Sequence, residues 1–214
     1  MMIECPSCAR RQPPLLTCPD CGSPLAVSLD CFAALGIPRK LAIDPAALES
    51  RYHELSRKIH PDRFASSPAR VRDASIRATA ILTRSYRTLR EPVARGLYWL
   101  ELSGQKLAEN NKSVPPDLAE LVFEVQEQLA AMRDAPAGSG AARELAAEVA
   151  QRRARIQDTL DSTLAELGGN FLKWDQRTDE KVLTLELKAI LSSIAYLRTL
   201  LRDVDRALEN SNAA

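Results

Sequence analysis

Apolar residues recur at helical spacing along most of the chain beyond residue 29. The clearest early stripe has steps of 4, 3 and 4 and consists of Leu48, Tyr52, Leu55 and Ile59. Asp44 is a suitable N-cap, and Pro45 suits the first helical position. Pro61 forces the residue before it out of the α region. The pattern therefore predicts an amphipathic helix that begins after Asp44 and ends just before Pro61.

A longer helix is predicted between Ser67-Pro68 and Pro92, a run of about six turns. Its inward face consists of Val71, Ala78, Leu82, Tyr86 and Leu89. Its outer face is basic and carries Arg70, Arg72, Arg77, Arg84, Arg87 and Arg90. A short helix around Phe32 precedes both helices and stops at Gly36. We expect the two long helices to pack as an antiparallel hairpin, with the loop that joins them at its tip.

Three further stripes follow in the second half of the chain. The first consists of Leu118, Val122, Val125, Leu129 and Met132, the second of Leu145, Val149, Ile156, Leu160, Leu164 and Leu167, and the third of Leu183, Leu187, Ile190, Ile194, Leu197, Leu201, Val204 and Leu208. Turn-rich breaks at 134–140 and at Gly168-Gly169-Asn170 separate them. Seams of this kind imply closely wound helices. We predict an antiparallel three-helix bundle over residues 102–214, with a homodimeric coiled coil as the alternative.

Composition supports this all-α prediction, because Leu, Ala, Glu and Arg are abundant and favour helices. A net charge of +1 argues against a globally basic nucleic-acid binder. The N-terminal stretch lacks the apolar core of a secretory signal, and no run of roughly 18 apolar residues suggests a membrane span. We therefore expect a cytoplasmic protein with no membrane partner, whose thiols stay reduced.

Four of the five cysteines form two pairs with two residues between them, Cys5 with Cys8 and Cys18 with Cys21. Such pairs aim four sulfurs at one tetrahedral ion. We predict a zinc ribbon over residues 1–28 that holds one structural Zn²⁺ per chain, and whose folding the metal drives. Redox dithiols and two disulfides are the alternatives. A closed four-thiolate shell leaves no open position for zinc catalysis, and Cys31 falls outside the pattern as a small apolar residue.

The loop between the two long helices contains one of only two histidines, as His60-Pro61-Asp62. An acid/base pair would need a pocket and a third orienting group. The sequence offers no glycine-rich phosphate loop, no serine nucleophile motif and no second histidine in a nearby loop. The other histidine, His53, lies on the helix face away from the apolar stripe. We therefore predict that the protein is not an enzyme.

The same segments resemble a J-domain, and in detail the HscB/Jac-type J-protein family, co-chaperones of iron–sulfur cluster assembly. The matching residues are Phe32, Leu35-Gly36-Ile37-Pro38, His60-Pro61-Asp62-Arg63-Phe64, Leu89-Arg90-Glu91-Pro92 and Arg95-Gly96-Leu97-Tyr98-Trp99-Leu100. The resemblance covers about residues 30 to 210 and places the J-domain at 29–101. A tetracysteine ribbon occurs in part of that family.

The resemblance implies two partners. One is a DnaK-type ATPase chaperone of the HscA kind, which the J-domain docks on and stimulates. Its binding residues would be Arg51, Arg57, Lys58, His60, Pro61 and Asp62. The basic residues would meet an acidic surface of the chaperone, and Asp62 would engage one of its arginines. For Arg51 or Arg57 alone, a merely solvated charge is the alternative.

The other implied partner is an IscU-type scaffold, bound by the C-terminal bundle. The family motif falls on Phe123, Glu124 and Glu127. The chain departs from the family at Ala119 and Glu120, where larger apolar residues are usual. It also departs at Ala189, a position that is often aromatic. Alternatively, Phe123 is simply a bundle residue.

Two other functions remain open from the sequence. One is a general J-protein with other clients. The other is a zinc-ribbon protein that binds nucleic acid or serves as a regulatory binding protein, using the ribbon and the arginine face at 70–90.

Overall fold

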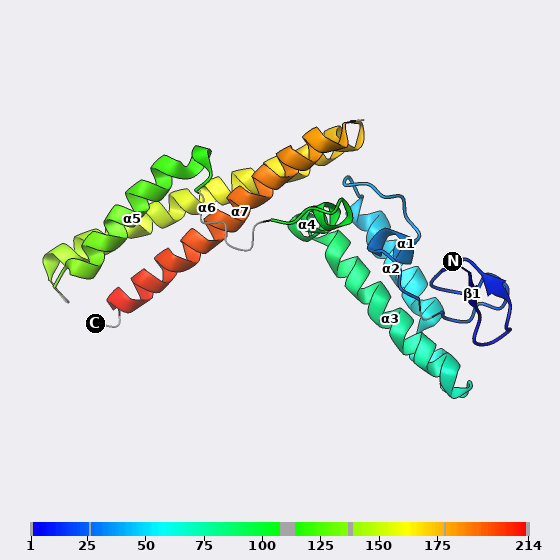
Figure 1. Ribbon diagram of the computed structural model, residues 1–214. Helices are drawn as coiled ribbons and strands as arrows, with labels where there is room; N and C mark the ends of the chain where they lie inside the picture. The colour runs from blue at the N-terminus through cyan, green and yellow to red at the C-terminus, as the bar shows by residue number, and fades with distance from the viewer. Residues whose placement is uncertain (1, 26, 108–113, 137–138, 178, 213–214) are drawn as a thin grey trace. The chain divides into compact units, whose positions relative to one another are not determined.

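The chain divides into two units in the computed structural model, one up to Tyr98 and one from Trp99 onward (Figure 1). The structure describes residues 2–25, 27–107, 114–136, 139–177 and 179–212. Over these residues it is mostly helical, as the sequence predicts. None of the helices within this part of the chain is both long and apolar enough to cross a membrane.

The first unit begins with a small ribbon. Strand β1 (Ile3–Glu4) pairs antiparallel with β2 (Arg11–Gln12), so that Ile3 faces Gln12 across the ladder. A bridge between Thr17 and Pro24 forms the second half of the ribbon. Its apolar core is small and consists of Cys5, Cys18 and Leu25, with Ile3, Cys8 and Val27 against it. Two of the four paired cysteines therefore form the centre of the ribbon.

Helix α1 (Cys31–Leu35) is capped by Asp30, whose carboxylate accepts a hydrogen bond from the Ala33 N–H at 2.8 Å. It ends at Gly36, whose φ of 64° is the left-handed conformation that glycine adopts without strain. Cys31 is buried, as expected for a small apolar residue. Its backbone N–H donates to the Tyr98 hydroxyl at 2.9 Å, which anchors α1 to the middle of helix α4 (Pro92–Leu102).

Helices α2 (Pro45–Ile59) and α3 (Ala69–Arg90) form the predicted hairpin. Asp44 caps α2 through the Ala46 N–H, and the helix ends before Pro61. The inward residues predicted for α3 are all buried. Within the hairpin, Tyr52 stacks on Tyr86 with ring centroids 4.3 Å apart. The hairpin is therefore held by an apolar seam and one aromatic pair.

Helices α5 (Ala119–Asp134), α6 (Gly140–Asp175) and α7 (Glu180–Asn212) form the bundle, with the short 3₁₀ turn η2 (Pro116–Leu118) before α5. Figure 1 shows α6 and α7 side by side along most of their length, with α5 along the first part of α6. The three seams pack against one another within one chain. Part of the predicted break at 134–140, residues 137–138, lies outside the described residues.

The predicted break at Gly168-Gly169-Asn170 is wrong, because α6 continues through it to Asp175. Each helical glycine costs about 1 kcal/mol relative to alanine. The continuation buries Phe171 and Trp174 against α7, and each large side chain contributes about 1.5–3 kcal/mol on burial. The Trp174 indole N–H also donates to the Glu186 carboxylate at 2.8 Å. Tertiary packing therefore outweighs the local signal of the glycines.

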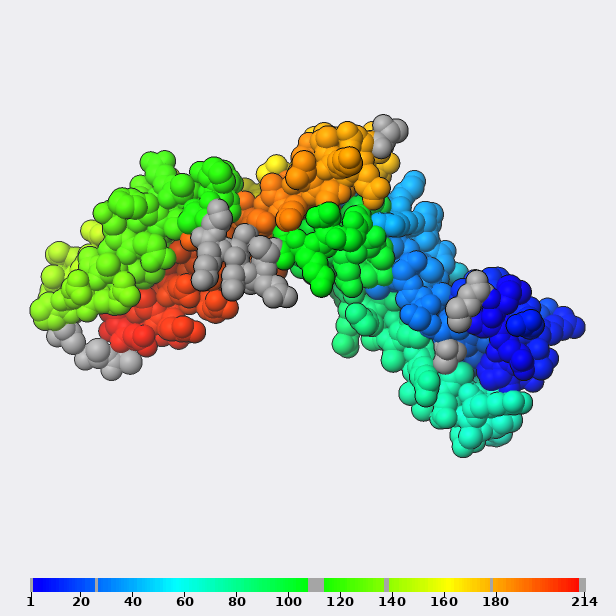
Figure 2. Space-filling view, in the orientation of Figure 1, coloured from blue at the N-terminus to red at the C-terminus, as the bar shows by residue number. Residues whose placement is uncertain are grey.

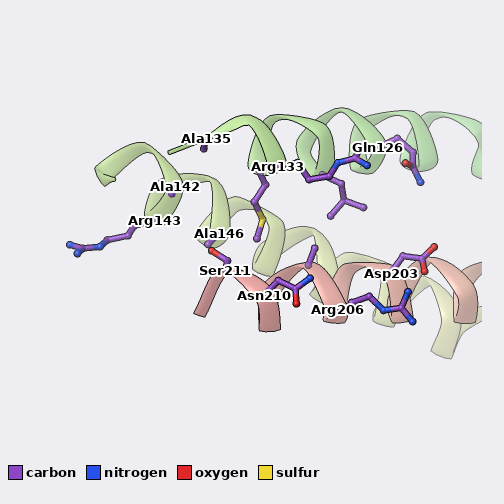
Figure 3. A pocket seen from close by; sticks show the side chains of 13 residues that line it. Gln126, Arg133, Ala135, Ala142, Arg143, Ala146, Asp203, Arg206, Asn210 and Ser211 are labelled. Atoms are coloured by element: carbon purple, nitrogen blue, oxygen red, sulfur yellow. The ribbon is translucent and has the colours of Figure 1, made fainter. Parts of the chain in front are cut away.

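The bundle is open at the end where α5 stops and α6 starts. A cavity of about 940 Å³ lies there, lined by residues of all three helices (Figure 3). Gln126 and Arg133 of α5 lie on one side of it, and Asp203 and Arg206 of α7 on the other. Met132, which lines the cavity, is accordingly only half-buried, and so is Leu208, although both belong to the predicted seams.

Candidate metal centre and docking surfaces

The four paired cysteines converge on one point of the ribbon. Their Sγ atoms all lie within 4.8 Å of one another. The Cys5 and Cys21 sulfurs are 3.6 Å apart, and those of Cys8 and Cys18 are 3.8 Å apart. A tetrahedral ion with Zn–S bonds of about 2.3 Å requires sulfurs about 3.8 Å apart. All four are free thiols, so the structure favours a metal site over the two-disulfide alternative.

The two cysteine pairs sit in turns that repeat each other with an offset of 13 residues. In the first, the Ala9 N–H donates to the Cys5 carbonyl, and the Cys5 N–H donates to that of Arg10. In the second, the Gly22 N–H donates to the Cys18 carbonyl, and the Cys18 N–H donates to the Ser23 carbonyl. The two equivalent residues, Ala9 and Gly22, both have positive φ, at 58° and 70°. Alanine rarely adopts this conformation, so closing the first turn costs strain that the glycine turn avoids.

The electrostatics of the cluster suit a cation. Burial raises the pKa of the Cys18 thiol, but backbone N–H groups of Cys21 and Asp20 and the side chains of Cys21 and Gln12 lower it to about 6. The backbone N–H of Arg10 lowers the pKa of Cys8, whereas burial and the three other cysteines raise it, to about 12. Thiolates this close repel one another unless a positive ion neutralises them.

The His60-Pro61-Asp62 loop forms a single 3₁₀ turn, η1 (Pro61–Phe64), between α2 and α3. The His60 Nδ1 accepts a hydrogen bond from the Asp62 N–H at 3.3 Å, and it lies 3.5 Å from the Asp62 carboxylate. On the inner side, the Ser75 hydroxyl donates to the Ile59 carbonyl at 2.6 Å and ties the end of α2 to α3. The Asp62 side chain is 89% exposed, so its carboxylate points to solvent from a fixed turn.

The basic residues of α2 are not equivalent. Arg51 donates to the Leu35 carbonyl at 2.9 Å, and its guanidinium lies 2.7 Å from the Glu54 carboxylate. Lys58 lies 2.6 Å from the other oxygen of Glu54. Hydrogen bonds from Lys58 and Arg51 lower the pKa of Glu54 to about 2. Arg51 therefore joins α2 to α1, whereas the side chain of Arg57 is exposed.

The three residues predicted to bind the scaffold do not face the same way. Phe123 is 63% exposed and therefore lies outside the bundle core. Glu127, one turn later, is also exposed and shares its face. Glu124 turns toward α6, where its carboxylate lies 2.8 Å from Arg152. Figure 2 shows α5, in light green, along one edge of the bundle.

Sequence reasoning missed two features near these sites. One is the pair of salt bridges that Glu54 makes, and its i,i+3 and i,i+4 spacing to Arg51 and Lys58 is the signal that predicts both. Gln12 is buried beside the metal cluster. The sequence signal for its burial is the 13-residue repeat, in which Gln12 is equivalent to Leu25 of the second turn.

The chain was compared with known protein families, sequences and structures. No family-level sequence profile matches the chain. A co-chaperone protein HscB homolog of Bordetella pertussis (strain Tohama I) is 34% identical over 140 residues, which are 65% of this chain and 81% of that protein. The homologs of Bordetella parapertussis and Bordetella bronchiseptica match to the same extent.

Two solved structures share the fold. Human co-chaperone protein HscB aligns with a TM-score of 0.66 at 23% identity, covering 95% of this chain and 97% of that one. The chaperone HscB from Vibrio cholerae aligns with a TM-score of 0.56 at 20% identity, covering 85% and 99%.

A helical hairpin with an exposed turn at its tip, together with a three-helix bundle, is the fold that this chain shares with those two structures. The chain belongs to the HscB family of co-chaperones. This is a family of non-enzymatic proteins.

Proposed function

We propose that this protein binds an IscU-type iron–sulfur scaffold, delivers it to a DnaK/HscA-type chaperone and stimulates the ATPase of that chaperone. The observation that carries the proposal is the His60-Pro61-Asp62 turn. It exposes a carboxylate at the tip of the hairpin, where the hydrogen bond from Ser75 to the Ile59 carbonyl ties the end of α2 to α3. A turn that is already ordered loses little entropy on docking. The test is whether the chain accelerates single-turnover ATP hydrolysis by the chaperone.

The charge around the tip supports docking on an acidic surface. Arg57 and Lys58 are exposed beside the turn, and Arg63 donates to the Arg57 carbonyl at 3.1 Å. Exposed cations of this kind speed encounter with an acidic partner and orient it. The chemistry of ATP hydrolysis would take place entirely on the chaperone.

For the ribbon, we propose one structural Zn²⁺ held by Cys5, Cys8, Cys18 and Cys21. The sulfur spacing supports tetrahedral coordination, and an all-thiolate shell suits zinc among the common divalent ions. The ion would supply the cross-link that the small apolar core of the ribbon lacks.

For the client, we propose the outer face of α5. Phe123 offers an exposed aromatic anchor, and Glu120 and Glu127 flank it with negative charge. Interfaces concentrate their binding energy in such anchors. Glu124 would act indirectly, by holding α5 on α6 through Arg152.

Phe123→Ala is expected to weaken scaffold binding about tenfold or more, because it removes the anchor of the proposed interface. Isothermal titration with purified scaffold measures this. Leu185→Ala is the matched control, since Leu185 is 68% exposed on α7 and lies outside the proposed surface. Equal affinities for wild type and Phe123→Ala would contradict the assignment.

Glu54→Gln is expected to increase the rate of association with the chaperone by a few fold at low salt, an effect that screening abolishes at high salt. The reason is that Glu54 neutralises Arg51 and Lys58. Glu49→Gln on the same helix is the control, because Glu49 contacts neither cation. The association rate of each variant with the chaperone is measured by stopped flow. An unchanged or slower rate for Glu54→Gln would count against an acidic docking partner.

A further inference from the structure

Gln12 is a buried polar residue in an otherwise apolar place. It is only 3% exposed, and within the described part of the chain neither amide atom has a hydrogen-bond partner. It lies on β2, paired with Ile3. An unsatisfied buried amide costs about 1–3 kcal/mol. The fold therefore keeps a costly group where an apolar side chain would fit.

The internal repeat shows which apolar side chain would fit. With the offset of 13 residues, Ile3 and Gln12 correspond to Leu16 and Leu25. The second pair is joined by a bond from the Leu25 N–H to the Leu16 carbonyl, and both side chains are buried. The second turn thus places leucine where the first has glutamine. Packing alone does not explain an amide at this position.

The group nearest to the amide explains it better. Ile3, the ladder partner of Gln12, packs against the core that Cys18 forms with Cys5 and Leu25, so the buried Gln12 side chain lies at the same core, beside the Cys18 thiol. Cys18 is itself buried, so its sulfur cannot rely on water for hydrogen bonds. Backbone N–H groups of Asp20 and Cys21 already act on this sulfur, as the Ser7 N–H does on the Cys5 Sγ at 3.4 Å, and the Gln12 amide would add a side-chain donor. A metal-bound thiolate is a charged acceptor and strengthens any N–H bond it receives.

We propose that Gln12 is a positioning residue of the metal centre, whose side-chain N–H donates to the Cys18 thiolate and holds it for the ion. The inference rests on the proposed metal site. Partners of this kind orient the ligand, and their loss typically costs 10–100-fold in metal affinity. Because Gln12 belongs to the first turn and Cys18 to the second, the bond would also join the two halves of the ribbon.

Two variants of the full chain test this role. Gln12→Leu copies the second turn and should preserve or improve packing. Gln12→Glu keeps the length of the side chain but places a carboxylate beside the thiolate. We expect zinc transfer to a chromogenic chelator to become about tenfold faster in Gln12→Leu and faster still in Gln12→Glu. With Co²⁺ as the probe, we expect both variants to shift the thiolate-to-cobalt charge-transfer band. Arg11→Gln, on the exposed side of the same strand, should match wild type in both measurements.

The outcomes separate the two hypotheses. If wild type takes up neither Zn²⁺ nor Co²⁺, the metal site itself is wrong, and the role of Gln12 falls with it. If wild type binds metal but Gln12→Leu releases zinc at the wild-type rate with an unshifted cobalt band, the metal site stands and the role of Gln12 is overturned. Equal release rates for Gln12→Leu and Gln12→Glu would indicate mere packing and would also overturn it.

Discussion

His60→Gln is expected to abolish stimulation of ATP hydrolysis by the DnaK-type chaperone, a loss of at least about tenfold. The His60 ring accepts the Asp62 N–H and lies against the Asp62 carboxylate. A glutamine has neither the ring nor its rigidity, so the turn and the direction of the Asp62 side chain would change together. The measurement is the single-turnover hydrolysis rate at increasing concentrations of co-chaperone.

The other histidine provides the matched control for this prediction. His53 is exposed on α2, away from the loop, and its nearest carboxylate is that of Glu49 at 3.9 Å. His53→Gln should therefore stimulate as wild type does. Full stimulation by His60→Gln, with both variants folded by circular dichroism, would show that the chaperone does not dock on this turn.

Cys18→Ser is expected to reduce bound zinc from one ion per chain to less than half, since three thiolates and a hydroxyl make a far weaker site. The ribbon should then lose its ordered structure, because its apolar core is too small to fold alone. Metal analysis of freshly reduced protein, together with proteolysis of the N-terminal segment, measures both effects.

The fifth cysteine separates metal binding from the general effect of losing a thiol. Cys31 is buried in α1 and lies outside the cluster, so Cys31→Ser should keep one zinc per chain. One zinc per chain in Cys18→Ser would rule out the four-cysteine site. Metal affinity should also rise with pH, because Cys8 and Cys21 have raised pKa values and must release their protons to the solution before they bind an ion.

Most of the fold could be predicted from periodicity, because packing in a helical protein follows the same stripes that the sequence displays. The caps Asp30 and Asp44 and the stop before Pro61 are set within a few residues of one another. Interactions of that range leave a direct signal in the sequence. The Gly168-Gly169 break failed for the opposite reason, since burial of Trp174 against α7 decides that segment from a distance.

In the candidate sites, too, locally determined features could be predicted from the sequence and features that depend on tertiary contacts could not. The cysteine spacing indicated the cluster because two short turns suffice to build it. The exposure of Phe123 could not be predicted, since a helical aromatic has the same signature on either side of a bundle. Arg51 was predicted as a docking residue, and its bond to the Leu35 carbonyl depends on how α1 meets α2. Spacing along α2 carries no information about that contact.

The proposed coupling of scaffold to chaperone is tested most directly by one measurement. Single-turnover ATP hydrolysis by the DnaK/HscA-type chaperone would be followed with the scaffold alone, with this protein alone, and with both together. We predict that this protein alone accelerates hydrolysis and that the two together exceed the sum of their separate effects, with Phe123→Ala losing only the added effect of the scaffold. No acceleration by the wild-type protein, with or without scaffold, would contradict the proposed function.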